Sequence, residues 1–266
     1  MFFVNQKQSP PPSPIQSIQR AAAILRSFTE AEPEVSVTEL SRRLDLHKST
    51  VSRILNTLQY EGLVGQNPET GKYRLGVGLV SLAGVALGRL DVRGLAQPHL
   101  STLVEISQET VNVTILDGNE CVNIERVASP KPIRYVGWIG RRTPLHCTAS
   151  GKLFLAHMPA AERSSRLRLP LARYTEKTIT EMPKLEQSLA QICAQGYAAV
   201  YEEFEEGFNA IAAPVFDHQG RVTATITISG PAYRLSTETI ETFVEPLQQV
   251  AQTISAEMGY TGPYQK

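Results

Sequence analysis

Residues 35–75 constrain the fold of this chain more than any other stretch, because two short helical patterns are followed there by a hairpin pattern. Ser36 and Glu39 have the spacing of a capping box, in which a hydroxyl and a carboxylate satisfy free amide groups at a helix start. A second helix is predicted from about Lys48 to Glu61, because apolar residues recur there at helical spacing. This apolar stripe comprises Val51, Ile54, Leu55 and Leu58.

The opposite face of this second helix carries no acidic residue between Lys48 and Glu61. An ordinary solvated helix is usually rich in Glu and Lys, whereas this face presents small hydroxyls, an amide and two cations. Such groups reach phosphates and base edges in the major groove of DNA. The residues of this face are Lys48, Ser49, Thr50, Ser52, Arg53, Asn56 and Thr57.

A hairpin is predicted directly after this helix. Gly62 suits the helix end because glycine readily adopts positive φ. Strand-like residues at 63–64 and 72–75 flank the turn formers of 67–71. Helix, loop, helix and hairpin in this order predict a winged helix-turn-helix DNA reader, with Lys72 and Arg74 along a phosphate backbone. The alternative is a small helical protein-interaction domain, which the acid-free helix disfavours.

The charge of one such reader is too small for tight binding by itself. The chain of 266 residues has a formal net charge of zero, and residues 35–75 hold six Lys and Arg against four Asp and Glu, a net charge of +2. Few phosphate contacts give weak, salt-sensitive binding, whereas two linked readers gain affinity through their effective concentration. We therefore expect a homodimer or homotetramer on a two-part operator.

Composition excludes several other classes. The three cysteines are far apart and form no CxxC pair, so neither a disulfide framework nor a zinc site is expected. No apolar run is long enough to span a membrane, and the N-terminus lacks the order of a signal peptide. We expect a cytoplasmic protein without a membrane partner, nucleoid-associated when bound to an operator.

The chain is expected to have four segments. Residues 1–14 have the composition of a disordered tail. Residues 15–76 form the DNA reader, with a first helix over 15–28 whose core face is Ile18, Ala22, Leu25 and Phe28. Residues 77–92 form a linker helix, which either pairs two subunits through its apolar and small residues or serves as a simple connector. Residues 93–262 form an α+β ligand-sensing domain.

The sensing domain is predicted to be an antiparallel sheet with helices packed on it. Strands are expected at 111–116, 121–128, 133–136, 197–201, 211–216 and 222–229. Helices are expected at 95–108, 148–157, 183–195 and 236–258.

Three separated motifs resemble the isocitrate-lyase-regulator (IclR) family of bacterial transcription factors. They are LSRRLDLHKSTVSRILNTLQYEGLV, IGRRTPLHCTASGKLFLA and FNAIAAPVFDHQGRVTATITISGP, in this order along about 15–260. The resemblance implies an N-terminal winged helix-turn-helix and a C-terminal effector-binding domain of GAF-like fold. It also implies a dimer or tetramer that usually represses operons of carbon-source metabolism in response to a small organic acid.

The resemblance carries the family's effector site onto Ala149, Ser150, Ala210, Thr227 and Ser229. The residues themselves support this, because 144–152 read as a turn entering a helix with small first-turn side chains, which leaves amide groups open to a carboxylate. Thr227 and Ser229 are two apart and therefore share one face of a strand.

Val200 borders the family pocket where some acid-binding members have a polar residue, so valine favours a more apolar ligand. Trp138 and Leu145 either wall this pocket or belong to the core or an interface. The acidic run at 202–206 is expected on a solvated loop beside the pocket.

For the DNA reader, Arg53 and Thr50 are expected to contact bases, and Lys48, Ser49 and Lys72 to contact phosphates. Arg42, Ser52 and Asn56 complete the expected DNA-binding set.

Two other functions are weighed against a ligand-controlled regulator. One is an enzyme for a small organic acid that its N-terminal domain localises on DNA, and the other is an architectural DNA-binding protein. The sequence offers no catalytic triad, metal-ligand spacing or complete phosphate loop, so we expect no catalytic residue, cofactor or metal. Our hypothesis is a regulator and not an enzyme.

Overall fold

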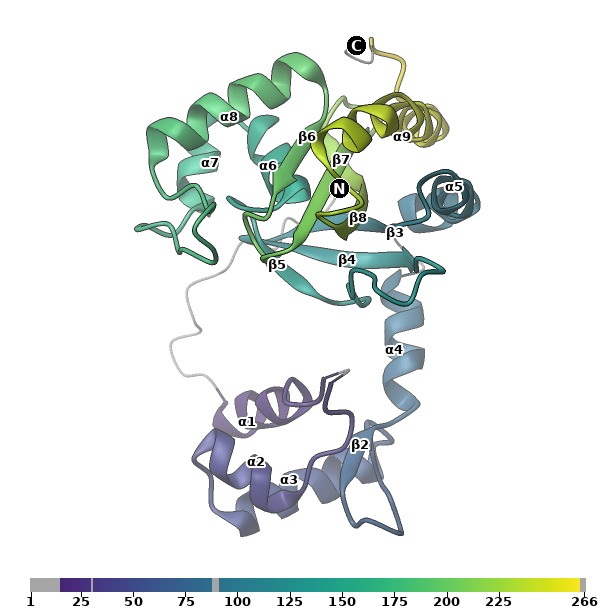
Figure 1. The fold of residues 1–266 in the computed structure, drawn as a ribbon. Helices are drawn as coiled ribbons and strands as arrows, with labels where there is room; N and C mark the ends of the chain where they lie inside the picture. Colours follow the sequence, from purple (N-terminus) through teal and green to yellow (C-terminus); the bar gives the residue numbers. More distant parts are fainter. Residues whose placement is uncertain (1–14, 30, 88–90, 264–266) are drawn as a thin grey trace. The chain divides into compact units, whose positions relative to one another are not determined.

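The computed structural model describes residues 15–29, 31–87 and 91–263 (Figure 1). The described residues up to Leu87 belong to one compact unit, and those from Asp91 onward belong to another. The expected tail at 1–14 and residues 88–90 of the expected linker lie outside the described residues. No described helix combines the length and apolar character that crossing a membrane requires.

In the N-terminal unit three helices pack on one another, and a short antiparallel hairpin follows and contacts the third of them. Its helices are α1 (Gln16–Leu25), α2 (Val37–Leu44), α3 (Lys48–Tyr60) and α4 (Gly78–Leu87), and its strands are β1 (Val64–Gln66) and β2 (Tyr73–Leu75). Val51, Leu55 and Leu58 of the predicted stripe are buried, and Gly62 has a φ of 71°. The predicted helix-helix-hairpin order is therefore confirmed.

Two local predictions in this unit need correction. Ser36 Oγ accepts a hydrogen bond from the Glu39 amide at 3.2 Å, but the Glu39 carboxylate binds arginines of α2 and does not return to Ser36. Ile18 was predicted in the core and is 64% exposed, whereas Ile24 is fully buried. The alanines before Ile24 fit a core on either face, so spacing alone misjudged the rotation of α1.

The C-terminal unit contains a six-stranded antiparallel sheet in the order β5-β4-β3-β8-β7-β6. Helices α5 and α9 cover one face of this sheet, and α6 covers the other with α8 outside it (Figure 1). The strands are β3 (Thr110–Asp117), β4 (Glu120–Val127), β5 (Arg142–Pro144), β6 (Ala198–Tyr201), β7 (Phe208–Phe216) and β8 (Val222–Pro231). The helices are α5 (Asp91–Ser107), α6 (Ala149–Ala156), α7 (Ala160–Arg166), α8 (Met182–Gln195) and α9 (Thr237–Glu257).

Most predicted elements of this unit agree with the structure within a few residues, one is wrong, and two were not predicted. The strand predicted at 133–136 is wrong, because Ile133 and Val136 are exposed and no strand forms there. β5 forms this edge of the sheet instead by pairing with β4, and it was not predicted because its three residues give almost no periodic signal. α7 was not predicted, since none of its residues is buried and it lacks an apolar stripe.

Candidate functional site

The predicted DNA-contacting residues of α3 gather on its solvent side. Lys48, Ser49, Arg53 and Asn56 are exposed, and Thr50 and Ser52 are partly buried. On the hairpin, Lys72 is exposed as well. Within the part of the chain that the structure describes, the cations of Lys48, Arg53 and Lys72 form no ion pair. They are therefore available to phosphates or base edges.

Two members of the predicted set already have intramolecular partners. Arg42 Nη2 lies 2.7 Å from Glu39 Oε1, and Ser49 Oγ lies 2.7 Å from His47 Nδ1. Hydrogen bonds from Arg42 and Arg43 lower the pKa of Glu39 to about 2. His47 also caps α3, accepting from the Ser49 amide at 3.3 Å.

Tyr60, at the end of α3, is 89% exposed and lies outside the set of residues predicted from the sequence. It follows Asn56 by four residues and is therefore one turn further along the same side of the helix.

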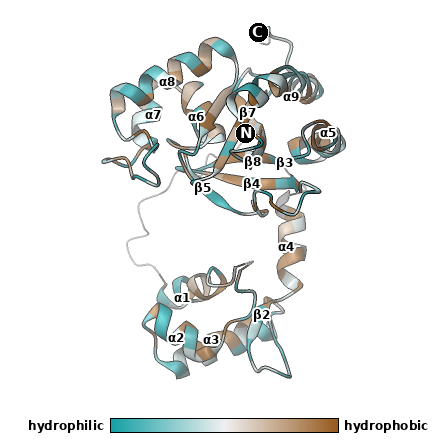
Figure 2. Ribbon diagram, viewed as in Figure 1, coloured by the Kyte–Doolittle hydropathy of each residue, from teal (hydrophilic) through white to brown (hydrophobic). Residues whose placement is uncertain are grey.

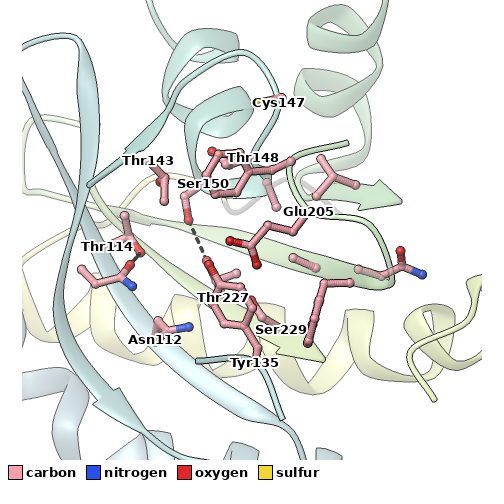
Figure 3. A pocket seen from close by; sticks show the side chains of 17 residues that line it. Asn112, Thr114, Tyr135, Thr143, Cys147, Thr148, Ser150, Glu205, Thr227 and Ser229 are labelled. Atoms are coloured by element: carbon pink, nitrogen blue, oxygen red, sulfur yellow. Dashed lines mark hydrogen bonds between the residues drawn. The ribbon is translucent and has the colours of Figure 1, made fainter. Parts of the chain in front are cut away.

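The second site is a pocket between α6 and the sheet face that α6 covers (Figure 3). Its volume is about 570 Å³ when the open solvent at its mouth is included. The structure brings all six predicted effector residues to the wall of this pocket, namely Ala149, Ser150, Val200, Ala210, Thr227 and Ser229. That they bind an effector stays a prediction.

Strand register explains why residues far apart in the sequence meet here. Ala210 of β7 lies opposite both Val200 of β6 and Ser229 of β8. Thr227 of β8 lies opposite Asn112 of β3. Side chains in such cross-strand rows project from the same face of the sheet.

A chain of hydroxyls joins α6 to the floor of the pocket. Ser150 Oγ lies 2.7 Å from Thr227 Oγ1 (Figure 3). Thr225 Oγ1 donates to Ser150 Oγ at 2.8 Å. Thr225 is fully buried and was not predicted. Its place two residues before Thr227, on the same face of β8, is a signal that sequence reasoning passed over.

The start of α6 presents free backbone donors at the pocket. Thr148 caps the helix by accepting from the Gly151 amide at 3.2 Å. The amides of Ala149 and Ser150 have no acceptor among the described residues. A side chain at Gly151 would place its Cβ 2.3 Å from the carbonyl oxygen of Leu145, so glycine permits this close turn. Unpaired amides and the positive end of the helix dipole together favour an anion.

The other predicted wall residues lie elsewhere. Leu145 belongs to the hydrophobic core, and Trp138 packs its ring 5.0 Å from the Arg141 guanidinium without lining the pocket. Asn112 is 2% exposed and lines the pocket, yet its Oδ1 has no hydrogen-bond partner among the described residues. Sequence reasoning missed Asn112, because only the pairing of β3 with β8 reveals its position.

The acidic run at 202–206 is only partly a solvated loop, contrary to expectation. Glu203 is buried and accepts a hydrogen bond from Lys152 Nζ at 2.5 Å. Glu205 lines the pocket and forms an ion pair with Arg141. Only the side chain of Glu206 is exposed among the four acids.

The neighbouring residues His146 and Cys147 do not form a nucleophile pair. His146 Nε2 bonds the carbonyl oxygen of Ala172 at 2.8 Å, and burial lowers the pKa of the imidazole. Burial also raises the pKa of the Cys147 thiol to about 12. Both groups are therefore neutral at physiological pH, and His146 has a structural role. Within the described ranges no cluster of His, Cys, Asp and Glu could hold a metal ion.

Both units match models of known protein domains. A family model described as the bacterial transcriptional regulator IclR C-terminal domain matches residues 84–256, and one described as the IclR helix-turn-helix domain matches residues 17–68. The HTH-type transcriptional regulator XynR of Escherichia coli (strain K12) is 38% identical over 247 residues, covering 92% of this chain and 98% of XynR. The HTH-type transcriptional repressor AllR of Klebsiella pneumoniae is 34% identical over 245 residues, covering 92% of this chain and 90% of AllR.

A solved structure agrees over nearly the whole chain. The crystal structure of an IclR homolog from Microbacterium hydrocarbonoxydans, complexed with 4-hydroxybenzoate, has a TM-score of 0.81 and 26% sequence identity. The match covers 91% of this chain and 99% of that one. With both domains matched in order, the chain belongs to the IclR family of bacterial transcriptional regulators.

Proposed function

We propose that this protein represses a metabolic operon by binding its operator, and that a small organic acid in the α6 pocket controls this binding. The observation that carries the proposal is the exposed side of α3, which offers hydroxyls, an amide and free cations with no acid among them. Membership of a family of transcriptional regulators supports it, and the repressor AllR supports the sign of regulation.

The roles on DNA follow from exposure and pairing. Arg53 reaches base edges from the middle of α3, with Thr50 one turn before it. Lys48, Ser49 and Lys72 contact phosphates, which position the reader without reading sequence. Ser52, Asn56 and Arg42 complete the interface, with Arg42 exchanging its bond to Glu39 for a phosphate.

The test measures binding of the purified protein to the DNA upstream of its own gene by fluorescence anisotropy. Arg53→Ala with Thr50→Ala is expected to weaken specific binding by roughly tenfold or more, since each good base contact is worth about 1–3 kcal/mol. Arg26→Ala is the matched control, because it removes an exposed cation outside α3. Unchanged affinity and sequence preference in the double variant would refute the assignment.

The pocket is proposed to take the carboxylate of the acid at the free amides of Ala149 and Ser150. Ser150 and Thr227 add hydroxyls beside them, and a buried site strengthens such hydrogen bonds. Val200 and Ala210 shape the apolar part of the wall, and Ser229 adds a further hydroxyl. Binding of an acid is expected to raise the thermal midpoint and to change operator affinity, and the two effects are measured on the same sample.

Self-association is proposed because one helix is apolar on its exposed side. α4 carries apolar residues along its length (Figure 2), and Val80, Leu82 and Val85 are each at least 60% exposed. A small unit with a net charge near +2 requires a second reader for tight binding. We therefore propose that the protein acts as a homodimer or homotetramer through α4.

A further inference from the structure

Glu205 is an acid that the fold holds inside the pocket wall. It lies on the loop between β6 and β7, and its side chain points into the pocket with 35% of its surface exposed (Figure 3). Arg141 pairs with Oε1 of this carboxylate. The other oxygen, Oε2, has no partner among the residues that the structure describes.

Arg141 is itself fixed, so the position of Glu205 is set by the fold. The Arg141 side chain is only 12% exposed, and its Nη1 donates to the carbonyl oxygen of Val136 at 3.0 Å. Its guanidinium lies 5.0–5.6 Å from the ring centroids of three aromatic side chains, a distance at which cation–π attraction operates. These rings belong to Tyr135, Trp138 and Phe204.

The loop that carries Glu205 is anchored on its other side as well. Glu203, two residues earlier, is paired with the buried Lys152 of α6 at 2.5 Å. Glu202 Oε1 accepts from the amide of Gly207 at 2.9 Å and so closes the loop on itself. A carboxylate held in this way acts as a fixed acceptor, because little conformational entropy remains to be lost when a ligand binds it.

The pocket wall carries acceptors that no described group satisfies, beside donors of its own. No Lys, Arg or His lies among the described residues that line it, and the amides of Ala149 and Ser150 at the start of α6 lack acceptors there. Glu205 Oε2 and the amide oxygen of Asn112 both lack a donor among the described residues. A ligand that brings one carboxylate for α6 and a hydroxyl donor for Glu205 therefore satisfies groups that are otherwise unpaired.

We propose that Glu205 is a specificity-determining residue that selects a hydroxylated monocarboxylate. This inference rests on the proposed acid effector and adds to it the class of acid. A hydroxyl of the ligand donates to Glu205 Oε2 and forms a charge-assisted hydrogen bond. A second carboxylate is rejected, because two like charges close together in a pocket of low dielectric repel each other.

The experiment uses two matched sets of acids with the full-length protein. One set is hexanoate, gluconate and glucarate, and the other is benzoate, 4-hydroxybenzoate and terephthalate. Each set offers the plain acid, the hydroxylated acid and the dicarboxylate. Affinities are measured by isothermal titration calorimetry for the wild type, Glu205→Gln and Glu206→Gln. The last variant is the control, because it removes the same charge from the exposed neighbouring residue.

In at least one set the wild type and Glu206→Gln are expected to prefer the hydroxylated acid over both other members by about tenfold or more, the range of a charge-assisted hydrogen bond. In Glu205→Gln this preference falls by about the same factor, and the dicarboxylate gains, because Arg141 has lost its carboxylate. The ratio is measured within one protein, so a general loss of stability cancels.

Two failures are distinguishable. Equal binding of the plain and hydroxylated acids by the wild type, or an unchanged ratio in Glu205→Gln, overturns the role of Glu205 and leaves the acid effector standing. If no acid of either set binds the wild type, this inference and the proposed acid effector both fall.

Discussion

The buried pair of Lys152 and Glu203 allows a quantitative test of what holds the pocket together. Lys152 is 1% exposed on α6, and its Nζ lies 2.5 Å from Glu203 Oε1. Glu203 Oε2 is buried with no hydrogen-bond partner among the described residues. Lys152→Met keeps an unbranched, mostly apolar side chain and removes the charged ammonium group, so it leaves the carboxylate of Glu203 buried without a counter-charge.

Removing one partner of a buried ion pair typically costs about 3–5 kcal/mol, whereas replacing both by apolar residues is often neutral or stabilising. In a domain of this size about 1 kcal/mol corresponds to roughly 2–4 °C. Lys152→Met is therefore expected to lower the melting temperature of the effector domain by roughly 6–20 °C. Lys152→Met with Glu203→Met is expected to recover most of this loss.

The assay is thermal unfolding followed by fluorescence of Trp138, the single tryptophan of the chain, which lies in the effector domain. Lys177→Met is the matched control, because Lys177 pairs with Glu202 at the surface and is 59% exposed. An exposed pair contributes at most about 1 kcal/mol. The reasoning is refuted if Lys152→Met costs no more than Lys177→Met, or if the double variant loses as much as the two single variants together.

Three further predictions concern other parts of the chain. Burial raises the pKa of the Cys147 thiol from an ordinary value of 9.0 to about 12, so this thiol ionises at lower pH in the unfolded state than in the folded state. The urea concentration at the midpoint of unfolding should therefore fall as pH rises from 9 toward 12. A constant midpoint would contradict this. Gly151→Ala places a Cβ 2.3 Å from the backbone oxygen of Leu145 and should therefore unfold or severely destabilise the effector domain. An unfolding midpoint equal to that of the wild type would show that the turn can open. Val80→Glu with Val85→Glu should lower the mass measured by light scattering to that of a smaller oligomer, and an unchanged mass would move the subunit interface away from α4.

Local signals were enough to predict the helix-helix-hairpin order of the N-terminal unit. The apolar stripe of α3 is set by a period of 3.6 residues, and the end of the helix by Gly62, so neither depends on distant residues. That Thr227 and Ser229 lie on the same face of β8 was predicted in the same way, from the two-residue period of a strand. The residues that form such patterns are close together in the sequence, so their relative geometry can be predicted from the sequence alone.

The polar side of the pocket required the register of strands that are far apart in the sequence. Asn112 reaches the pocket because β3 pairs with β8, whose residue opposite it lies more than one hundred positions later in the sequence. The ion pair of Arg141 with Glu205 joins two loops, and no periodicity describes loops. From the sequence, Val200 indicated a more apolar ligand. The residues that strand register places around it in the pocket, however, carry mostly hydroxyl and amide groups.

A small coupling free energy is enough for the proposed control. Reducing operator affinity tenfold requires about 1.4 kcal/mol, close to the value of one hydrogen bond that a ligand makes in one state of the protein and not in another. The loop between β6 and β7 is suited to such a difference, since Glu203 ties it to α6 and Glu205 faces the ligand. A ligand that binds both Glu205 and the start of α6 contacts this loop and the helix to which Glu203 ties it. The control of DNA binding therefore does not require a large rearrangement of the sheet, only a ligand whose hydrogen bonds differ between two states of the protein.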